Sequence, residues 1–260
     1  MAAGPPGLVL SDAQDCALRA IRTGRNLLLQ GPAGTGKSVV VELAVKTLRA
    51  AHKRVAVAAP TAAAAFLVGG CTLHSLLSPL PQYSTADQLV AGLSHWLRTQ
   101  VQHDGARNTK SQKRQMRHLA FSTLDVIFLD ETSMLRPDLL HILDRVARTT
   151  RQSPDLPFGG IQVVLVGDLA QLPPVPLQAR ADSKARAPDL FFFERAHPEL
   201  PNSFEDGNFE CITLDRVYRQ SNGVFLDILT NARNAVPFDD WSGECQVSFC
   251  LAALRGLHPR

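Results

Sequence analysis

Cysteine is scarce in this sequence, and its placement argues against two common ways of stabilising a small domain. The chain has 5 cysteines among 260 residues, and no two of them form a C-x-x-C pair. A framework of paired disulfides and a zinc site of the usual spacing are therefore not expected. This usage is typical of a reducing, intracellular compartment.

The sequence also lacks a segment that suits a membrane or a targeting machinery. Its longest apolar stretch, residues 55–70, is interrupted by Pro60 and Thr61 and is too short to span a bilayer. Residues 1–10 are rich in Pro and Gly and have no basic residue ahead of their apolar part. They resemble neither a secretory signal nor a transit peptide, and we expect no membrane partner.

A strong charge of one sign is absent as well. The formal net charge of +3 is too small to indicate a nucleic-acid partner by itself. With 45% hydrophobic and 20% charged residues, the chain has an ordinary globular composition and enough length for one large domain or one domain and part of another. Residues 103–118 carry 5 basic residues against 1 acidic residue, so they form either a helix that touches nucleic acid or a solvated face.

What is present is the phosphate-binding pattern G-x-x-x-x-G-K-[ST] at residues 31–38. An apolar run at 27–29 predicts a strand before it, and apolar residues at helical spacing predict a helix from about Lys37. Small residues let the backbone wrap a polyphosphate, while Lys37 would reach the β- and γ-phosphates and Ser38 would bind Mg²⁺. The predicted nucleotide-binding residues are Gly31, Pro32, Ala33, Gly34, Thr35, Gly36, Lys37 and Ser38.

Two adjacent carboxylates follow the apolar run at 124–129. Asp130 would hold Mg²⁺, and Glu131 would polarise the water that attacks the γ-phosphate. The alternative is that the pair only caps the helix that begins near Pro137. The phosphate loop upstream favours the catalytic interpretation.

Other polar residues follow predicted strands or lie near the loop. Gln171, after the strand predicted at 161–166, is a candidate sensor of the γ-phosphate. Gln14, on the first turn of a helix capped by Ser11, either presents its amide to adenine or is a solvated helix residue. After the strand at 55–59, the side chains that would hold nucleic-acid phosphates, or else belong to an ordinary polar loop, are Thr61, Thr72 and His74.

Together these blocks resemble the petite-integration-frequency (Pif-type) DNA helicases of superfamily one, collinearly over residues 10–236. Leu10-Ser11 with Gln14 is similar to the family's Q motif. Residues 61–65 and 69–75 are similar to its DNA-contacting block, although Ala62 stands where the family usually has Gly. The blocks at 130–134 and 167–174 look like its metal and sensor motifs. Residues 218–220 look like its fourth motif, which implies that Arg219 reaches the γ-phosphate.

The resemblance implies a three-layer α/β fold, a RecA-like P-loop NTPase domain with a mostly parallel sheet. We expect this lobe at residues 1–205, with a basic insert at about 98–120 and a loop at 176–190. Residues 206–260 would begin a second motor lobe that is incomplete here, because the family's Q-G-x-T-like and A-L-S-R-like blocks do not occur in the sequence.

The implied activity is ATP hydrolysis coupled to 5′-to-3′ movement on single-stranded DNA, with Mg²⁺, in DNA repair, recombination or telomere maintenance in the nucleus or mitochondrion. The catalytic residues would be Lys37, Glu131, Gln171 and Arg219. One alternative is a nucleotide- and DNA-binding helicase remnant with little turnover. Another is a clamp-loader-like P-loop ATPase, against which the block at 167–174 speaks. The sequence leaves the oligomeric state open.

Overall fold

The computed structural model describes residues 9–77, 121–174, 191–195, 198–218, 223–233, 236–240, 242 and 243. The predicted basic insert at about 98–120, the predicted loop at 176–190 and Arg219 lie outside the described residues.

A six-stranded sheet in the order β3-β2-β4-β5-β1-β6 forms the centre of the fold, and every neighbouring pair of strands is parallel. This arrangement confirms the predicted α/β class, since parallel strands need crossover connections and cover on both faces. The strands are β1 (Leu27–Gln30), β2 (Val55–Ala59), β3 (Cys71–Thr72), β4 (Val126–Leu129), β5 (Gln162–Gly167) and β6 (Glu210–Thr213).

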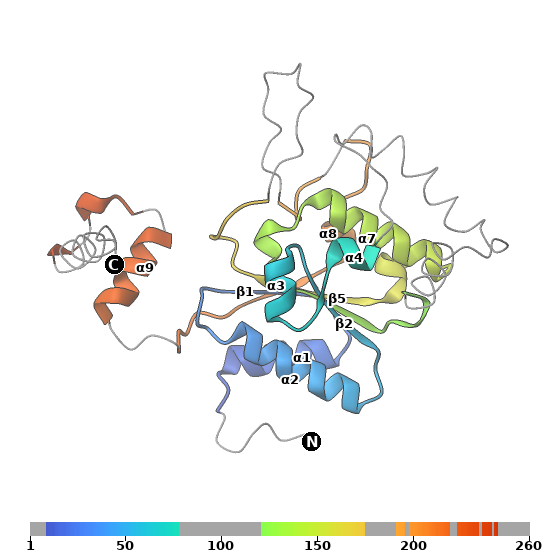
Figure 1. Cartoon of the computed structure of the whole chain (residues 1–260), viewed down its shortest axis with the longest axis horizontal. Helices are drawn as coiled ribbons and strands as arrows, with labels where there is room; N and C mark the ends of the chain where they lie inside the picture. The colour runs from blue at the N-terminus through green and yellow to red at the C-terminus, as the bar shows by residue number, and fades with distance from the viewer. Residues whose placement is uncertain are drawn as a thin grey trace.

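Helices cover both faces of this sheet, so the molecule has three layers. In Figure 1, α1 and α2 lie on one side, and α7 lies on the other side with α4 and α8. The helices are α1 (Asp12–Arg22), α2 (Lys37–Ala50), α3 (Ala62–Leu67), α4 (Leu73–Leu77), α7 (Pro137–Thr150), α8 (Ser203–Asp206) and α9 (Gly223–Arg233), with short 3₁₀ turns η1 (Thr132–Met134), η2 (Pro157–Gly160) and η3 (Phe238–Asp240). None of the helices in the described ranges is long and apolar enough to cross a membrane.

The central strands are apolar between their ends because each one faces two cores. Leu28 and Leu165 belong to the core beneath α7, whereas Leu27, Leu29 and Val164 belong to the core beneath α1 and α2. Successive side chains of a strand point to opposite faces, so a strand covered on both sides has no polar positions to spare.

The last strand extends the sheet beyond the predicted domain boundary. β6 pairs with β1 from Leu27 with Glu210 to Gln30 with Thr213, so it belongs to the same sheet as the strand before the phosphate loop. The boundary between residues 205 and 206 stays a prediction. Assignment of the residues that follow to a second motor lobe stays a prediction.

Candidate nucleotide-binding site

The predicted phosphate loop connects β1 to α2 at the carboxyl edge of the sheet. β1 ends at Gln30 and α2 begins at Lys37, as the pattern predicts. The N–H of Gly31 donates to the carbonyl of Gly167 at 3.2 Å and thereby fixes the start of the loop to the end of β5. Because the strands are parallel, the residues that follow β4 and β5 lie at this same edge.

Several carbonyls of the phosphate loop accept hydrogen bonds from the protein, whereas N–H groups at its tip point to no protein acceptor among the described residues. Carbonyls of the loop accept hydrogen bonds from the side chains of Lys37 and Gln14 and from the N–H of Tyr218; they are those of Gly31, Pro32, Gly34 and Thr35. At the tip, N–H groups donate to no acceptor in the described part of the chain; they are those of Gly34, Thr35, Gly36, Lys37 and Ser38. A row of such N–H groups at a helix N-terminus is an anion-binding site.

Gln14 supports the loop from α1. Its side chain is 4% exposed. Its Oε1 accepts from the N–H of Ser11 at 3.0 Å, in a capping box, and its Nε2 donates to the carbonyl of Thr35 at 3.0 Å. Gly36 has a φ of +85°, and a Cβ there would collide with this amide. The interpretation of Gln14 as a solvated residue is wrong, and adenine recognition by Gln14 stays a prediction.

Lys37 lies folded over the loop. Its Nζ donates to the carbonyls of Gly31 at 2.7 Å and Pro32 at 3.0 Å. Burial lowers the pKa of Lys37 from its usual value, while nearby carboxylates, Asp168 foremost, oppose the shift. The ammonium group thus lies where the loop would bring a polyphosphate.

Asp130 and Glu131 follow β4 at the same edge. The Oδ1 of Asp130 accepts from the N–H of Glu131 at 2.9 Å. Burial raises the pKa of both carboxyl groups, and the charge of Asp130 raises the pKa of Glu131 further. Glu131 has a φ of +53°, a conformation uncommon outside Gly, Asn and Asp. The helix-capping alternative is wrong, because α7 begins at Pro137 with Arg136 as its N-cap.

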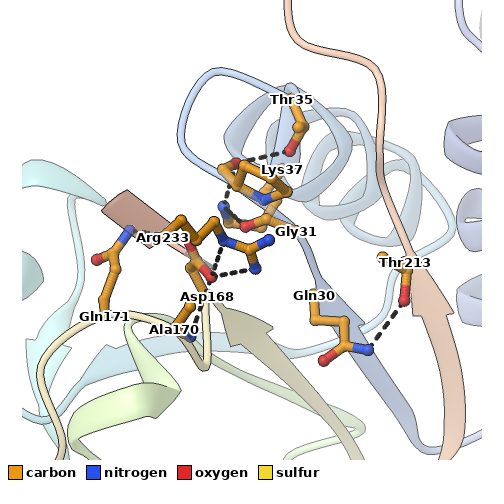
Figure 2. A network of polar contacts seen from close by, with 10 residues as sticks. Gln30, Gly31, Thr35, Lys37, Asp168, Ala170, Gln171, Thr213 and Arg233 are labelled. Atoms are coloured by element: carbon orange, nitrogen blue, oxygen red, sulfur yellow. Dashed lines mark hydrogen bonds and ion pairs between the residues drawn. The ribbon is translucent and has the colours of Figure 1, made fainter. Parts of the chain in front are cut away.

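Asp168, one residue past β5, forms an ion pair with a helix far along the chain. Nη2 of Arg233, the last residue of α9, donates to its Oδ1 at 2.7 Å. Burial acts to raise the pKa of Asp168, but hydrogen bonds from Arg233 and from the N–H of Ala170 outweigh it, so the pKa is lowered. Figure 2 shows this network beside the loop. Sequence analysis gave neither residue of the ion pair a role; a polar residue directly after a buried strand was the available signal for Asp168.

Gln171 lies at this network and beside a hollow. Its Nε2 approaches Oδ2 of Asp168 at 3.4 Å, and its side chain is largely exposed. The hollow has a volume of about 630 Å³ and is lined by Thr61, Ala64, Leu67, Glu131, Ser133, Met134, Ala170, Gln171, Leu172 and Pro173. It therefore connects the predicted γ-phosphate sensor and Glu131 with part of the predicted DNA surface.

The three predicted DNA contacts have different surroundings. The hydroxyl of Thr61 accepts from the N–H of Ala64 at 3.2 Å and caps α3, and the hydroxyl of Thr72 accepts from the N–H of Ser75 at 3.1 Å. His74 is exposed on α4. Only Thr61 of the three lines the hollow. Both hydroxyls therefore have local structural roles, and DNA contact by any of the three stays a prediction.

The residues present fit a magnesium ion that is held mainly by a bound nucleotide. Within the described ranges, no group of 3 or more His, Cys, Asp or Glu side chains is placed to hold a metal. Ser38 is exposed, and its hydroxyl makes no hydrogen bond to a described residue. Protein Mg²⁺ sites of this kind use one or two oxygen ligands together with phosphates, for which Ser38 and Asp130 are suited.

The sequence matches a family model described as PIF1-like helicase over residues 9–225. The chain belongs to the PIF1-like helicase family. The phosphate loop, Gln14, Glu131 and Gln171 fall inside the matched span, whereas Arg233 lies beyond it. The predicted family is thus confirmed.

Relatives of this family match nearly the whole chain. It is 32% identical over 257 residues to the ATP-dependent DNA helicase PIF1 of Candida albicans, covering 97% of this chain and 26% of that protein. It is 31% identical over 225 residues to the ATP-dependent DNA helicase Pif1 of Bdellovibrio bacteriovorus, covering 86% of this chain and 43% of the relative.

Solved structures show the same fold. A Pif1 helicase from Bacteroides in complex with ADP-AlF3 and ssDNA has a TM-score of 0.66 at 28% identity, covering 91% of this chain and 48% of that one. The Pif1 helicase from Candida albicans has a TM-score of 0.63 at 31% identity, covering 87% of this chain and 44% of that one. The RecA-like prediction is confirmed, and the chain spans less than half the length of these relatives.

Proposed function

We propose that this chain forms the ATP-hydrolysing lobe of a DNA helicase that moves 5′-to-3′ along single-stranded DNA. The observation that carries the proposal is the phosphate loop, whose tip presents N–H groups without acceptors among the described residues. Lys37 lies over this loop, within electrostatic range of Asp130 and Glu131. A phosphate site facing two carboxylates is the arrangement that hydrolysis of a nucleoside triphosphate requires.

In the proposed reaction, the loop N–H groups bind the phosphates and Lys37 exchanges the carbonyls of Gly31 and Pro32 for β- and γ-phosphate oxygens. Glu131 orients a water molecule in line with the γ-phosphorus and accepts its proton. The water oxygen bonds to phosphorus as the bond to the bridging oxygen breaks, and ADP leaves with the bridging oxygen. Burial raises the pKa of Glu131, which suits a carboxylate that must accept a proton near neutral pH.

Ser38 and Asp130 would hold Mg²⁺ beside the phosphates. The ion would supply neutralisation of the negative charge that develops on the phosphate oxygens. Gln171 would sense the γ-phosphate across the hollow that it shares with Glu131. Arg219 would add positive charge from the segment after Tyr218, whose N–H donates to the carbonyl of Gly34 at 2.8 Å.

Single-stranded DNA would cross the surface that carries Thr61, Thr72 and His74. At the hollow, Leu67 is 83% and Leu172 is 73% exposed, so bases would find apolar contacts there. The structural relative in complex with ssDNA supports single-stranded DNA as the partner by analogy. We infer an intracellular role in genome maintenance, in the nucleus or the mitochondrion, from the same family resemblance.

Turnover of ATP by the purified chain, with and without single-stranded DNA, tests the proposal. We expect hydrolysis that DNA stimulates and that Lys37→Ala abolishes. Lys46→Ala is the matched control, because Lys46 lies on the same helix and forms an exposed ion pair with Glu42 at 2.7 Å. Nucleotide binding without turnover would favour the alternative of a non-catalytic remnant, and no nucleotide binding would reject both.

A further inference from the structure

Arg233 reaches the nucleotide site from outside the sheet. Its Nη2 and Nε donate to Oδ1 of Asp168 at 2.7 and 3.3 Å. In Figure 1, α9 lies apart from the sheet, so this contact brings a helix that the core does not enclose to the edge where nucleotide would bind. The side chain of Asp168 is 5% exposed and that of Arg233 is 34% exposed, which leaves the arginine open on one side.

The open side of Arg233 faces the phosphate loop. In Figure 2, the guanidinium group lies between Asp168 and the loop at Gly31 and Lys37. Its Nη1 donates to no acceptor in the described part of the chain. Lys37 and Arg233 are close enough for the positive charge of one to act on the other. An anion placed at Lys37 would therefore meet a second cation with donors to spare.

The ion pair with Arg233 also neutralises the negative charge of Asp168 beside the phosphate site. Without a partner, the carboxylate of Asp168 would repel a polyphosphate bound at Lys37, because unlike water the half-buried site screens charge poorly. Arg233 neutralises that carboxylate and keeps its other edge available. A guanidinium group suits this double use because its planar fork binds carboxylate and phosphate alike through paired hydrogen bonds.

We propose that Arg233 is a further residue of the nucleotide site, which Asp168 positions to bind the terminal phosphate of ATP. This inference rests on the proposed function and adds a group that neither the sequence motifs nor the matched span of the family model includes. Arg233 would then distinguish triphosphate from diphosphate, since only the triphosphate extends past Lys37 to this position.

Calorimetric titration of the 260-residue chain with Mg-ADP and with a non-hydrolysable Mg-ATP analogue tests the assignment. Arg233→Ala is expected to weaken analogue binding about tenfold or more, the effect of losing a charged hydrogen bond, and to leave ADP binding nearly unchanged. Arg233→Lys keeps the positive charge but lacks the planar fork, so its affinity for the analogue should lie between those of the unsubstituted chain and Arg233→Ala. The lysine variant also tests the proposal if the alanine variant does not fold. Arg49→Ala, an exposed arginine on α2, is the control and should change neither affinity.

Asp168→Asn should weaken binding of the ATP analogue, because Arg233 would lose the residue that positions it. In the Arg233→Ala background, Asp168→Asn should weaken analogue binding no further. If Arg233→Ala and Arg233→Lys weakened binding of the ATP analogue and of ADP equally, or left the ratio of the two affinities unchanged, the arginine would be only structural. That result would overturn this inference alone. Failure of the unsubstituted chain to bind either nucleotide would instead reject the proposed function on which it rests.

Discussion

The hydroxyl of Thr132 donates to the carbonyl of Val166 at 3.1 Å and joins the turn after β4 to the end of β5. Thr132 follows Glu131 directly, and Val166 lies two residues before Asp168. A Cβ at Gly167 would lie 2.7 Å from the Thr132 hydroxyl, so the close approach depends on that glycine. This hydrogen bond thus fixes the position of Glu131, the proposed water-orienting carboxylate, relative to the proposed phosphate-sensing segment after β5.

Thr132→Val should separate these two segments without changing the volume of the core. Thr132 is fully buried, so loss of its hydrogen bond should lower the free energy of unfolding by about 1–2 kcal/mol. ATP turnover should fall more than ATP affinity, because the phosphate loop itself is untouched. Urea unfolding and steady-state hydrolysis measure the two effects. Thr132→Ser, which keeps the hydroxyl, should restore most of the turnover; equal rates in both variants would contradict this role.

Glu131→Gln should preserve ATP affinity and reduce hydrolysis by about 10²-fold or more, since the amide cannot accept the proton of the attacking water. Single-turnover hydrolysis and equilibrium titration, compared with Glu42→Gln on the exposed face of α2, provide the measurement. A parallel loss of affinity and rate would mean that Glu131 binds the metal or supports the fold.

Gln14→Ala should weaken both the fold and nucleotide binding. The variant loses the hydrogen bonds to Ser11 and to the Thr35 carbonyl, which should cost about 1–3 kcal/mol of unfolding free energy because the amide is buried. Thermal unfolding and titration with ATP and GTP report the two effects. Ser11→Ala, which removes only the capping hydroxyl, is the control. If Gln14→Ala changed only the preference for ATP over GTP, base recognition would be its main role.

His141 predicts a pH dependence of stability. Burial lowers the pKa of His141 to about 4, although Asp144 opposes the shift. The unfolded chain takes up the proton near the usual pKa of about 6.5, so stability is fully present above that pH and declines by about 3 kcal/mol as the pH falls to 4. Urea unfolding between pH 7.5 and 4.5 measures the slope. His141→Gln should flatten it, whereas replacement of the exposed His52 by Gln should leave it unchanged; identical slopes in all three proteins would exclude His141 as the source.

Binding of single-stranded DNA should weaken steeply with salt and depend little on base sequence, because the proposed contacts are to phosphates. Fluorescence anisotropy with labelled oligonucleotides at several salt concentrations is the measurement. Combined replacement of Thr72 and His74 by Ala should weaken binding, while His52→Ala, in the exposed turn after α2, should not. Affinity that ignores salt, or survives the double replacement, would remove this surface from the DNA path.

The sequence predicted the sheet well where burial dictates composition. A strand such as β5 must be apolar on both faces, so its run of Val and Leu residues was recognisable within one residue of its bounds. β3 was not predicted, because its two residues, Cys71 and Thr72, pair with the end of β2 and have no pattern long enough to show. The phosphate loop was predictable because its glycines and its lysine occur at fixed spacing.

The side-chain partners within the site were less predictable. Arg233 meets Asp168 across 65 positions of sequence, and although Asp168 directly follows a buried strand, no local pattern marks Arg233 as its partner. Gln14 was correctly placed near the loop, but its support of Thr35 depends on how α1 packs, which spacing does not specify. Residue type and periodicity predict elements, whereas a hydrogen bond between distant segments depends on tertiary packing.

The hydrogen bond from Tyr218 to the carbonyl of Gly34 makes the phosphate loop a mechanical anchor for the chain beyond the sheet. Leu214 is likewise fastened, through its N–H, to the carbonyl of Gln30 at 2.8 Å. A displacement of the loop tip on nucleotide release would pull this segment along with it. α9 begins only five residues after Tyr218, at Gly223. The hydrogen bond at Gly34 thereby couples the state of the phosphate site to the position of Tyr218, the last described residue before α9.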